Sequence, residues 1–500
     1  MESNKRIAVE SFQIPEKCDV VVIGAGIGGL TTASYLAKRG LNVLILEKHH
    51  SVGGCAGSFR HGDYYFDAAA HSLGSCRPDG QLGRLINDHQ LNSSLKLIRI
   101  DPTDTVLTRH VKAVFRTDRM LALKELQQTF PGERSSIKAF FDYVLDSAST
   151  VLYAELYGKS FYEVLNYYFK DKNLIEVFSM LLGNIGLSSR SASAITGVFL
   201  YREYIFDGGY YPVGGIQKLA DSLVNRFKEY GGKILLLSPV TEIVSDSSKT
   251  IKGIKFKHKG RTQVEVAAKH VVVNCSIHEL FQKMFSSHLR NKLFKKEEAQ
   301  YLNKVPSASA LVLHLGLKGN LDSQTQFRVP LWAYDGPNTI DDYWDSINNG
   351  DPDLSEESFI FINIPSLHDR SLLPSGKHSL QAISGFPFFR DTEIRFDYKL
   401  LKQIMLKRVQ KYMGDLSDMI EFAELATPRT IYKYTGNYGG AIYGWAALKS
   451  QVNRDSYAQP TFMDGLYLVG HWAGLPTGYS GIPSVVANGR MVADLVLRNN

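Results

Sequence analysis

The first 50 residues alternate between apolar runs and a glycine-rich break in a pattern that predicts a βαβ unit. Residues 18–23 form a short, largely apolar run that predicts a buried strand. The glycine-rich segment 24–29 follows, and residues 30–39 then place apolar side chains at helical spacing. Residues 41–46 form a second apolar run. Strand, turn, helix and strand together occupy about 30 residues, which is the size of one βαβ unit.

Two later stretches repeat the α/β pattern. The middle of the chain predicts a helix, a strand, a hairpin and another buried strand, at 216–230, 233–237, 250–268 and 270–274. The end of the chain predicts a strand at 465–469 and a helix at 484–497, with a glycine-rich loop between them. We expect the three α/β pieces to assemble one sheet.

Two long inserts separate these pieces, and 500 residues are many for one compact core. The first insert is rich in helical pattern and aromatic residues. The second mixes strands such as 309–315 with helices such as 398–412. The predicted fold class is therefore α/β, with a Rossmann-like nucleotide-binding domain and an inserted α+β substrate lobe. The nucleotide-binding domain is predicted to be discontinuous, at 15–100, 206–290 and 441–500, and the lobe to comprise 101–205 and 291–440.

Composition and charge exclude several classes of protein. The net charge of +7 arises from 57 basic and 50 acidic residues without a dense basic block, so nothing indicates nucleic-acid binding. The four cysteines are scattered without the spacing of metal ligands or of a disulfide framework, so no metal site is predicted. Residues 1–17 do not resemble a signal peptide, and no run reaches the roughly 18 apolar residues of a spanning helix. We expect a cytoplasmic protein that can dock on a membrane surface.

The glycine-rich turn carries a dinucleotide fingerprint. Gly24 allows a tight turn, Gly26 lets the backbone approach a pyrophosphate, and Gly29 lets helix and strand pack closely. The helix that follows directs its free N–H groups and its positive dipole end at the phosphates. Glu47 ends the second strand, where a carboxylate accepts hydrogen bonds from ribose hydroxyls and would repel a 2′-phosphate. The unit therefore predicts a dinucleotide other than NADP.

Further glycine clusters favour FAD over NAD. Residues 53–59 read Gly-Gly-Cys-Ala-Gly-Ser-Phe, which suggests backbone lying against an extended ligand. Near the end, Gly470-His471 and the segment 478–483 precede a helix with Pro483 in its first turn. The N-terminus of that helix could stabilise the negative charge of a reduced flavin. The alternative, an ordinary glycine-rich loop before a final helix, stays open. The chain has no second G-x-G-x-x-G, so a separate NADPH domain is not expected.

The motifs together resemble the flavin-dependent phytoene desaturase, carotenoid isomerase and retinol saturase family. The matching segments are V-V-V-I-G-A-G-I-G-G-L, L-E-K-H-H-S-V-G-G-C-A-G-S-F, Y-F-D-A-A-A-H, G-Y-Y-P-V-G-G-I and G-L-Y-L-V-G-H-W-A. The resemblance implies a FAD-binding domain of the GR2 flavoprotein type and covers the FAD half of the chain. The residues that it implies around FAD are Gly24, Ala25, Gly26, Gly28, Gly29, Glu47, Lys48, Gly53, Gly54, Ser58, Val240, Gly470, His471 and Ile482.

The chain departs from the family pattern at two positions. His471 stands where the family usually has an aspartate that contacts the ribityl-diphosphate part of FAD. A neutral or cationic histidine could still donate to a phosphate. Cys55 stands where many desaturases carry an arginine. His71 resembles a histidine of the saturase group, so the pattern tilts towards isomerases and saturases.

Polyene redox chemistry needs little acid–base machinery, because the cofactor does the hydride work. The candidate catalytic residues are His71, Tyr211 and Arg202. For His71 the alternative is a core histidine bonded to backbone. For Tyr211 and its neighbour Tyr210 the alternative is packing before a turn proline. The aromatic first insert supplies material for a substrate tunnel, and equally for the core of a helical lobe.

Three classes of function remain open. The favoured one is an FAD-dependent enzyme that desaturates, saturates or isomerises a long apolar polyene. An amine oxidase is the second class, for which Trp472 and Tyr479 could form an aromatic cage. A non-catalytic binder of prenylated proteins is the third, and the intact glycine and Glu47 set argues against it. For membrane docking the candidate residues are Lys159, Lys170 and Lys172, beside Phe161, Tyr167, Tyr168 and Phe169.

Overall fold

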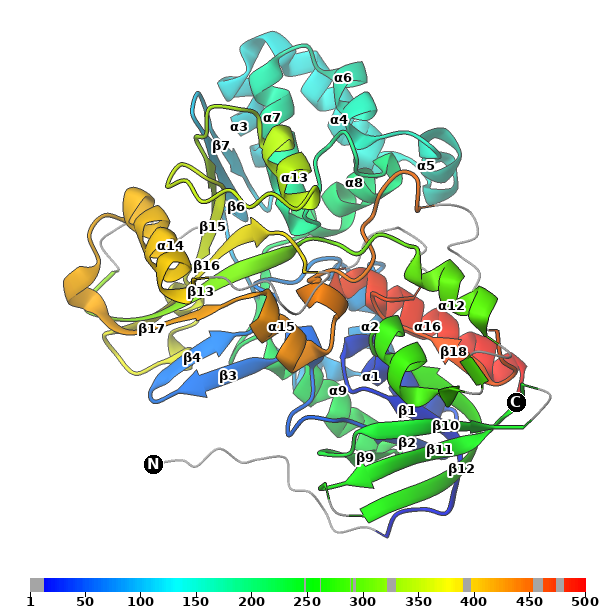
Figure 1. Cartoon of the computed structure of the whole chain (residues 1–500). Helices are drawn as coiled ribbons and strands as arrows, with labels where there is room; N and C mark the ends of the chain where they lie inside the picture. The colour runs from blue at the N-terminus through cyan, green and yellow to red at the C-terminus, as the bar shows by residue number, and fades with distance from the viewer. Residues whose placement is uncertain are drawn as a thin grey trace.

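A computed structural model of the chain describes residues 13–246, 249–260, 262–287, 289–290, 294–321, 330–389, 397–452, 462–473 and 481–500. Within these residues two seven-stranded sheets dominate, with a group of helices beside the second sheet (Figure 1). The mixed α/β fold class predicted from the sequence is confirmed.

The first sheet is the predicted nucleotide-binding sheet. Its strand order is β10-β11-β12-β1-β2-β9, and β18 pairs with β12. All three α/β pieces contribute to it, as expected, through β1 (Lys17–Ile23), β2 (Val43–Leu46), β9 (Lys233–Leu235), β10 (Val240–Ser245), β11 (Ile251–His258), β12 (Thr262–Val273) and β18 (Leu466–Leu468). The predicted hairpin arm and the buried strand after it are one long strand. The first half of β12 pairs with β11, and its second half pairs in parallel with β1 and β18.

Both faces of this sheet are buried, as the continuous apolar runs predict. Val20 and Val22 of β1 pack into the core that also contains side chains of α1 (Ile27–Lys38), α9 (Gln217–Glu229) and α16 (Ile482–Arg498). Val21 and Ile23 point to the opposite face, into the core shared with the β10–β12 hairpin. The predicted helices are confirmed, although α1 and α16 begin three and two residues earlier than their apolar patterns indicate.

The second sheet combines strands of the two inserts. Its order is β17-β13-β16-β15-β14-β6-β7. The strands are β6 (Asp104–Thr108), β7 (Lys112–Phe115), β13 (Ser309–Lys318), β14 (Leu331–Tyr334), β15 (Ile360–Asn363), β16 (Lys377–Phe386) and β17 (Ile420–Ala426). The parallel pairing of β6 with β14 joins the first insert to the second. Helix α14 (Tyr398–Met413) packs on this sheet through Leu401, Met405 and Val409. The predicted domain boundaries themselves stay a prediction.

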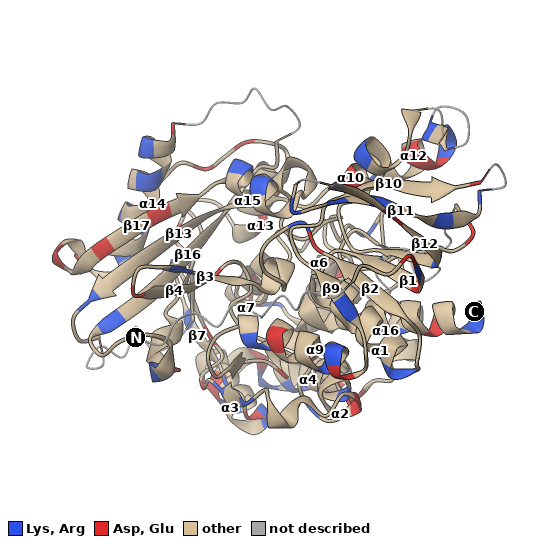
Figure 2. Ribbon diagram, turned by 90° about the horizontal axis from the view of Figure 1, so that it is seen from below, with Lys and Arg blue, Asp and Glu red and all other residues tan. Residues whose placement is uncertain are grey.

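The remainder of the first insert is a helical lobe with an aromatic core. It contains α3 (Arg119–Thr129), α4 (Arg134–Asp146), α5 (Ser149–Leu156), α6 (Phe161–Tyr168), α7 (Lys172–Met180) and α8 (Ala194–Leu200). Figure 2 shows basic and acidic residues interspersed over α3, α4 and α9. In the part of the chain that the structure describes, no helix is long and apolar enough to cross a membrane.

The proposed docking residues of this lobe are only partly on its surface. Phe161 and Phe169 belong to the buried core, at 0% and 2% exposure, because the apolar face of α6 packs inward. Tyr168 is half-buried against the same core. Tyr167 is 82% exposed, and all three lysines are exposed. Of the four aromatic residues in the docking hypothesis, only Tyr167 is therefore exposed.

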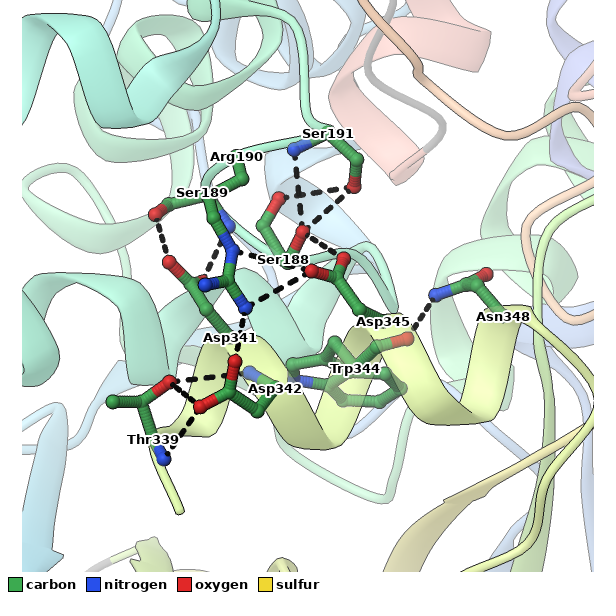
Figure 3. A network of polar contacts seen from close by, with 10 residues as sticks. All are labelled: Ser188, Ser189, Arg190, Ser191, Thr339, Asp341, Asp342, Trp344, Asp345 and Asn348. Atoms are coloured by element: carbon green, nitrogen blue, oxygen red, sulfur yellow. Dashed lines mark hydrogen bonds and ion pairs between the residues drawn. The ribbon is translucent and has the colours of Figure 1, made fainter.

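A polar network attaches α13 (Ile340–Asn348) to the segment before α8 (Figure 3). The carboxylate of Asp341 accepts from the backbone N–H and the hydroxyl of Ser189, at 2.6 and 2.5 Å, and both residues are buried. Arg190 bonds Asp342 and Asp345 at 2.5 and 3.0 Å at the rim. Since α13 belongs to the second insert, the network joins the helical lobe to the second sheet.

Candidate cofactor and substrate site

The turn between β1 and α1 is closed by the carboxylate of Glu47. Gly24 has a φ of +98°, a conformation that favours glycine. The next residue, Ala25, donates its backbone N–H to Oε2 of Glu47 at 2.7 Å, and His49 donates to Oε1 at 2.8 Å. Glu47 is only 7% exposed. Each carboxylate oxygen has a second lone pair, which is left to accept a ribose hydroxyl as the sequence predicts.

The second glycine cluster lies directly against this turn. Gly53 donates to the carbonyl of Ala25 at 2.8 Å, and a Cβ on Gly54 would lie 3.3 Å from the Cα of Gly26. Helix α1 begins at Ile27, and its N-cap, Gly26, provides no side-chain cap. The first N–H groups of α1 therefore stay available to an anion.

Two asparagines that the sequence motifs do not indicate hold the turn against the C-terminal motif. Asn274, just after β12, donates from Nδ2 to the carbonyl of Gly24 at 3.3 Å. A Cβ on Gly26 would meet the same Nδ2 at 2.8 Å, and one on Gly470 would meet Oδ1 at 2.5 Å. Asn488 of α16 accepts from the N–H of Gly470 at 3.0 Å. For Asn274, the signal in the sequence is a polar residue directly after a buried strand.

The C-terminal motif brings a second uncapped helix start to the site. Ile482 is the first residue of α16, Gly481 is its N-cap without a side-chain cap, and Pro483 lies in the first turn. Burial lowers the pKa of His471 to about 4. The ring is therefore neutral at neutral pH, and its Nε2 lies 3.2 Å from Oδ1 of Asn437. Residues 478–480, including Tyr479, are outside the described residues.

Three other predicted cofactor residues have their own local contacts. Lys48 forms an ion pair with Glu279 at 3.3 Å. Ser58 donates to Oδ1 of Asp67 at 2.8 Å. Val240 is the first residue of β10, where its backbone pairs with β11. Their contacts with the cofactor stay predictions.

The donor set fits FAD. The site offers backbone without side chains for a diphosphate, a carboxylate for a ribose and two uncapped helix N-termini for negative charge. Buried in the same place, Nδ2 of Asn488 makes no hydrogen bond with the described residues. The family model for flavin containing amine oxidoreductase matches residues 27–497.

The chain belongs to the flavin containing amine oxidoreductase family.

Two proteins similar to this chain match the resemblance noted in the sequence. The chain is 26% identical to all-trans-retinol 13,14-reductase of Danio rerio, over 95% of this chain and 87% of the relative. It is also 26% identical to the chloroplastic prolycopene isomerase of Arabidopsis thaliana, over 90% of this chain and 78% of the relative. Among solved structures, an oxidoreductase from Methanosarcina mazei has a TM-score of 0.64 at 18% identity, covering 95% and 99% of the two chains. That structural likeness shows the shared fold.

The protein is thus an FAD-dependent oxidoreductase of this family, and the cofactor and the enzyme class predicted from the sequence are confirmed. Bound FAD supplies the acceptance or return of a hydride. The chain's own residues would bind and orient the cofactor. Glu47 would accept the ribose hydroxyls, and the β1–α1 turn would hold the diphosphate. Asn274 and Asn488 set the distance between that turn and Gly470.

The structure places the three predicted catalytic residues in different surroundings. The hydroxyl of Tyr211 donates to Oδ2 of Asp67 at 2.6 Å, and its ring is fully buried. Arg202 donates to the carbonyl of Ser147 at 2.9 Å. The Nε2 atom of His71 lies within hydrogen-bond distance of the hydroxyl of Tyr204. The catalytic roles of all three stay predictions.

His71 lies in an aromatic environment. Its ring centroid is 4.3 Å from that of Phe361 and 6.1 Å from that of Trp332. Its Nε2 lies 3.4 Å from the hydroxyl of Tyr204. Burial lowers the pKa of His71 to about 4, although a side-chain hydrogen bond with Asn184 acts to raise it. His71 is therefore neutral at neutral pH, and it is bonded to a side chain instead of the backbone contact considered above.

Asp67 is a further residue that the sequence motifs do not single out. Its carboxylate accepts from Ser58, Tyr211 and the backbone N–H of Ile216, at 2.8, 2.6 and 3.1 Å. Asp67 and these donors belong to three of the segments that carry the family resemblance. Burial outweighs the hydrogen bonds and raises the pKa of Asp67 to about 6. Asp67 thus organises the backbone that leads to His71.

We expect Gly26→Val to prevent FAD binding, because its side chain would displace Asn274 and enter the diphosphate position. Heat or acid should release FAD without a covalent link from the purified wild-type protein, and little or none from the variant. Gly132→Val is the matched control, since a Cβ there meets nothing within 4 Å. Retention of FAD by the Gly26 variant at the wild-type level would contradict the assignment.

The buried Asp67 predicts a pH-dependent stability. The pKa of Asp67 in the folded protein, about 6, lies above its ordinary value of 3.8. The stability that protonated Asp67 contributes is therefore fully present below pH 3.8 and is lost as the pH rises through 6. Between pH 4 and pH 7, Asp67→Asn should therefore gain about 2 to 3 kcal/mol in unfolding free energy relative to wild type. Urea unfolding at several pH values measures this. Burial also raises the pKa of Asp104 to about 6. Because Asp104 titrates in the wild type and in Asp67→Asn alike, its effect cancels in the difference between the two unfolding free energies. A difference that does not change with pH would refute the prediction.

Proposed function

We propose that this flavoenzyme acts on a long apolar polyene of the carotenoid or retinoid type, by desaturation, saturation or cis–trans isomerisation. The observation that supports this most directly is the neutral aromatic environment of His71. Phe361 and Trp332 form its wall, at 1% and 3% exposure, and belong to the same continuous core as the helical lobe. Such an apolar environment suits a conjugated hydrocarbon chain, which offers area and π-electrons but few charges.

The names of the relatives agree with this substrate class. One relative is named a retinol reductase and the other a prolycopene isomerase, and both names refer to a polyene. In this proposal the uncharged side chains of His71 and Tyr204 offer hydrogen-bond donors and acceptors beside the hydrocarbon chain of the substrate. The aromatic wall excludes water from the reacting carbons, which protects a hydride in transfer.

The amine oxidase alternative loses one of its supports. Trp472 was a candidate for an aromatic cage around an amine. It is 3% exposed, lies with its ring centroid 4.8 Å from that of Trp445, and donates from Nε1 to Asn437 at 2.7 Å. A ring held in this way packs in the core. Tyr479, the other candidate, lies outside the described residues.

Direct turnover tests the proposed class. The FAD-loaded protein is mixed anaerobically with all-trans-retinol or a poly-cis carotene in liposomes, and with benzylamine in buffer. Oxidised protein tests desaturation, and dithionite-reduced protein tests saturation and isomerisation. We expect a changed polyene, detected by chromatography, and at least tenfold slower turnover of the amine. Efficient oxidation of benzylamine without any change in either polyene would assign the enzyme to the amine oxidases.

An apolar substrate resides in a bilayer, so we also propose docking of the helical lobe on anionic lipid. Tyr167 and Tyr157 are 82% and 45% exposed on this lobe, near the exposed Lys170 and Lys172. Reversing both lysines to glutamate should weaken co-sedimentation with anionic liposomes by tenfold or more, since each basic residue near such a surface contributes about 1 kcal/mol.

Charge reversal of Lys252 and Lys257 on β11, in the nucleotide-binding sheet, is the matched control and should leave liposome binding unchanged. High salt should weaken the wild-type interaction. Absence of liposome binding at low salt, or equal loss in both double variants, would remove the docking proposal.

A further inference from the structure

Three polar side chains meet beside the aromatic wall described above. The hydroxyl of Tyr204 lies 2.6 Å from Oγ of Ser72 and 3.4 Å from Nε2 of His71. All three residues are partly exposed, whereas Trp332 and Phe361 next to them are buried. We refer to Ser72, His71 and Tyr204 as the hydroxyl cluster.

The hydroxyl cluster directly follows the segment that pairs with the cofactor loop. Ala68 donates to the carbonyl of Gly57 at 2.9 Å, and Ala70 donates to the carbonyl of Cys55 at 3.3 Å. Residues 55 and 57 belong to the second glycine cluster, which lies against the β1–α1 turn. The chain therefore passes from the FAD site to the hydroxyl cluster within a few residues.

A π-helix places Tyr204 in the hydroxyl cluster. It spans Tyr201–Ile205, and such single π-turns are frequent at functional sites. Gly74 lets it approach, because a Cβ there would lie 2.8 Å from the Cα of Tyr204. The ion pairs of Arg77 with Glu203 and Asp207, at 2.9 and 3.0 Å, hold its neighbours. The position of the Tyr204 ring thus depends on contacts other than its own hydroxyl.

The chemistry of the hydroxyl cluster suits a neutral, hydrogen-bonding group. Burial raises the pKa of Tyr204 and lowers that of His71, so both are uncharged at neutral pH. A wall built only for a hydrocarbon would gain nothing from hydroxyls and an imidazole, because polar groups covered by a hydrocarbon lose their hydrogen bonds with water. A substrate hydroxyl replaces those bonds, since it both donates and accepts.

We propose that Tyr204, together with Ser72 and His71, binds the hydroxyl group of a polyene alcohol and selects it over a hydrocarbon of the same chain. This inference rests on the proposed function and specifies its substrate class. Tyr204 is then a specificity-determining residue that the sequence motifs do not reveal.

Equilibrium binding of two matched probes tests the inference. All-trans-retinol carries the hydroxyl, and the hydrocarbon in which its CH2OH group is replaced by CH3 lacks it. Quenching of protein fluorescence gives the Kd of each probe for the FAD-loaded wild type, Tyr204→Phe and Tyr201→Phe. We expect the wild type to prefer the alcohol by about tenfold, the value of one or two hydrogen bonds. Tyr204→Phe should reduce this preference to about twofold or less by raising only the Kd of retinol.

Tyr201→Phe is the matched control, because it removes a hydroxyl from the same π-helix that bonds the core instead of the cluster. It should keep the wild-type preference. Ser72→Ala removes another hydroxyl of the cluster and should also lower the preference for retinol over the hydrocarbon. This variant tests the inference if Tyr204→Phe fails to fold. Equal binding of both probes by the wild type, or an unchanged preference in the cluster variants, overturns the inference. Binding of neither probe also overturns the inference, whereas the proposed function fails only if the turnover experiment above changes neither retinol nor the poly-cis carotene.

Discussion

The hydrogen bonds that Glu47 accepts from the backbone are the constraint on which the site depends. Through them the end of β2 is tied to the start of α1 and to the chain after the strand, at 2.7 and 2.8 Å. A buried carboxylate is costly unless its oxygens are bonded, and here the turn itself supplies the donors. The closed turn positions α1 so that its backbone packs closely against that of α16, at a point where neither helix has a side chain. A Cβ on Gly489 would meet the carbonyl of Gly28 at 2.9 Å.

This close packing explains why asparagines, and not larger side chains, join the two ends of the chain at the site. Asn274 fits between the glycine turn and Gly470, and Asn488 holds Gly470 from the other side. Both amides replace backbone partners that the tight turn cannot supply. The diphosphate cradle is therefore a joint product of β1, β12 and α16, which are far apart in the sequence.

Asp67 extends the same principle from the cofactor towards the substrate region. Its side chain accepts hydrogen bonds from two other segments, and its carbonyl accepts from Gln381 of β16 at 2.9 Å. The second sheet thus meets the segments that carry Ser58 and Tyr211 at one buried residue. The His71 segment starts from this junction, which places it between the cofactor loop and the aromatic wall of the inserts. The neutral state of His71 follows from that location, since burial between two layers disfavours a charge.

Local pattern alone determined the βαβ unit, the hairpin, the final helix and the roles expected of Gly24, Gly26 and Glu47, because these depend on residues close together in the chain. The further glycine clusters favoured FAD, and the motif resemblance added the family. The tertiary structure decided what depends on distant segments. It buried Phe161 and Phe169 by packing α6 inward, and it turned Trp472 into the core. It also revealed Asn274, Asp67 and Tyr204, whose partners lie 250, 144 and 132 residues away. Periodicity reports which face of an element is apolar, but it does not report what that face meets. The aromatic wall and its polar cluster therefore exist only in the folded chain.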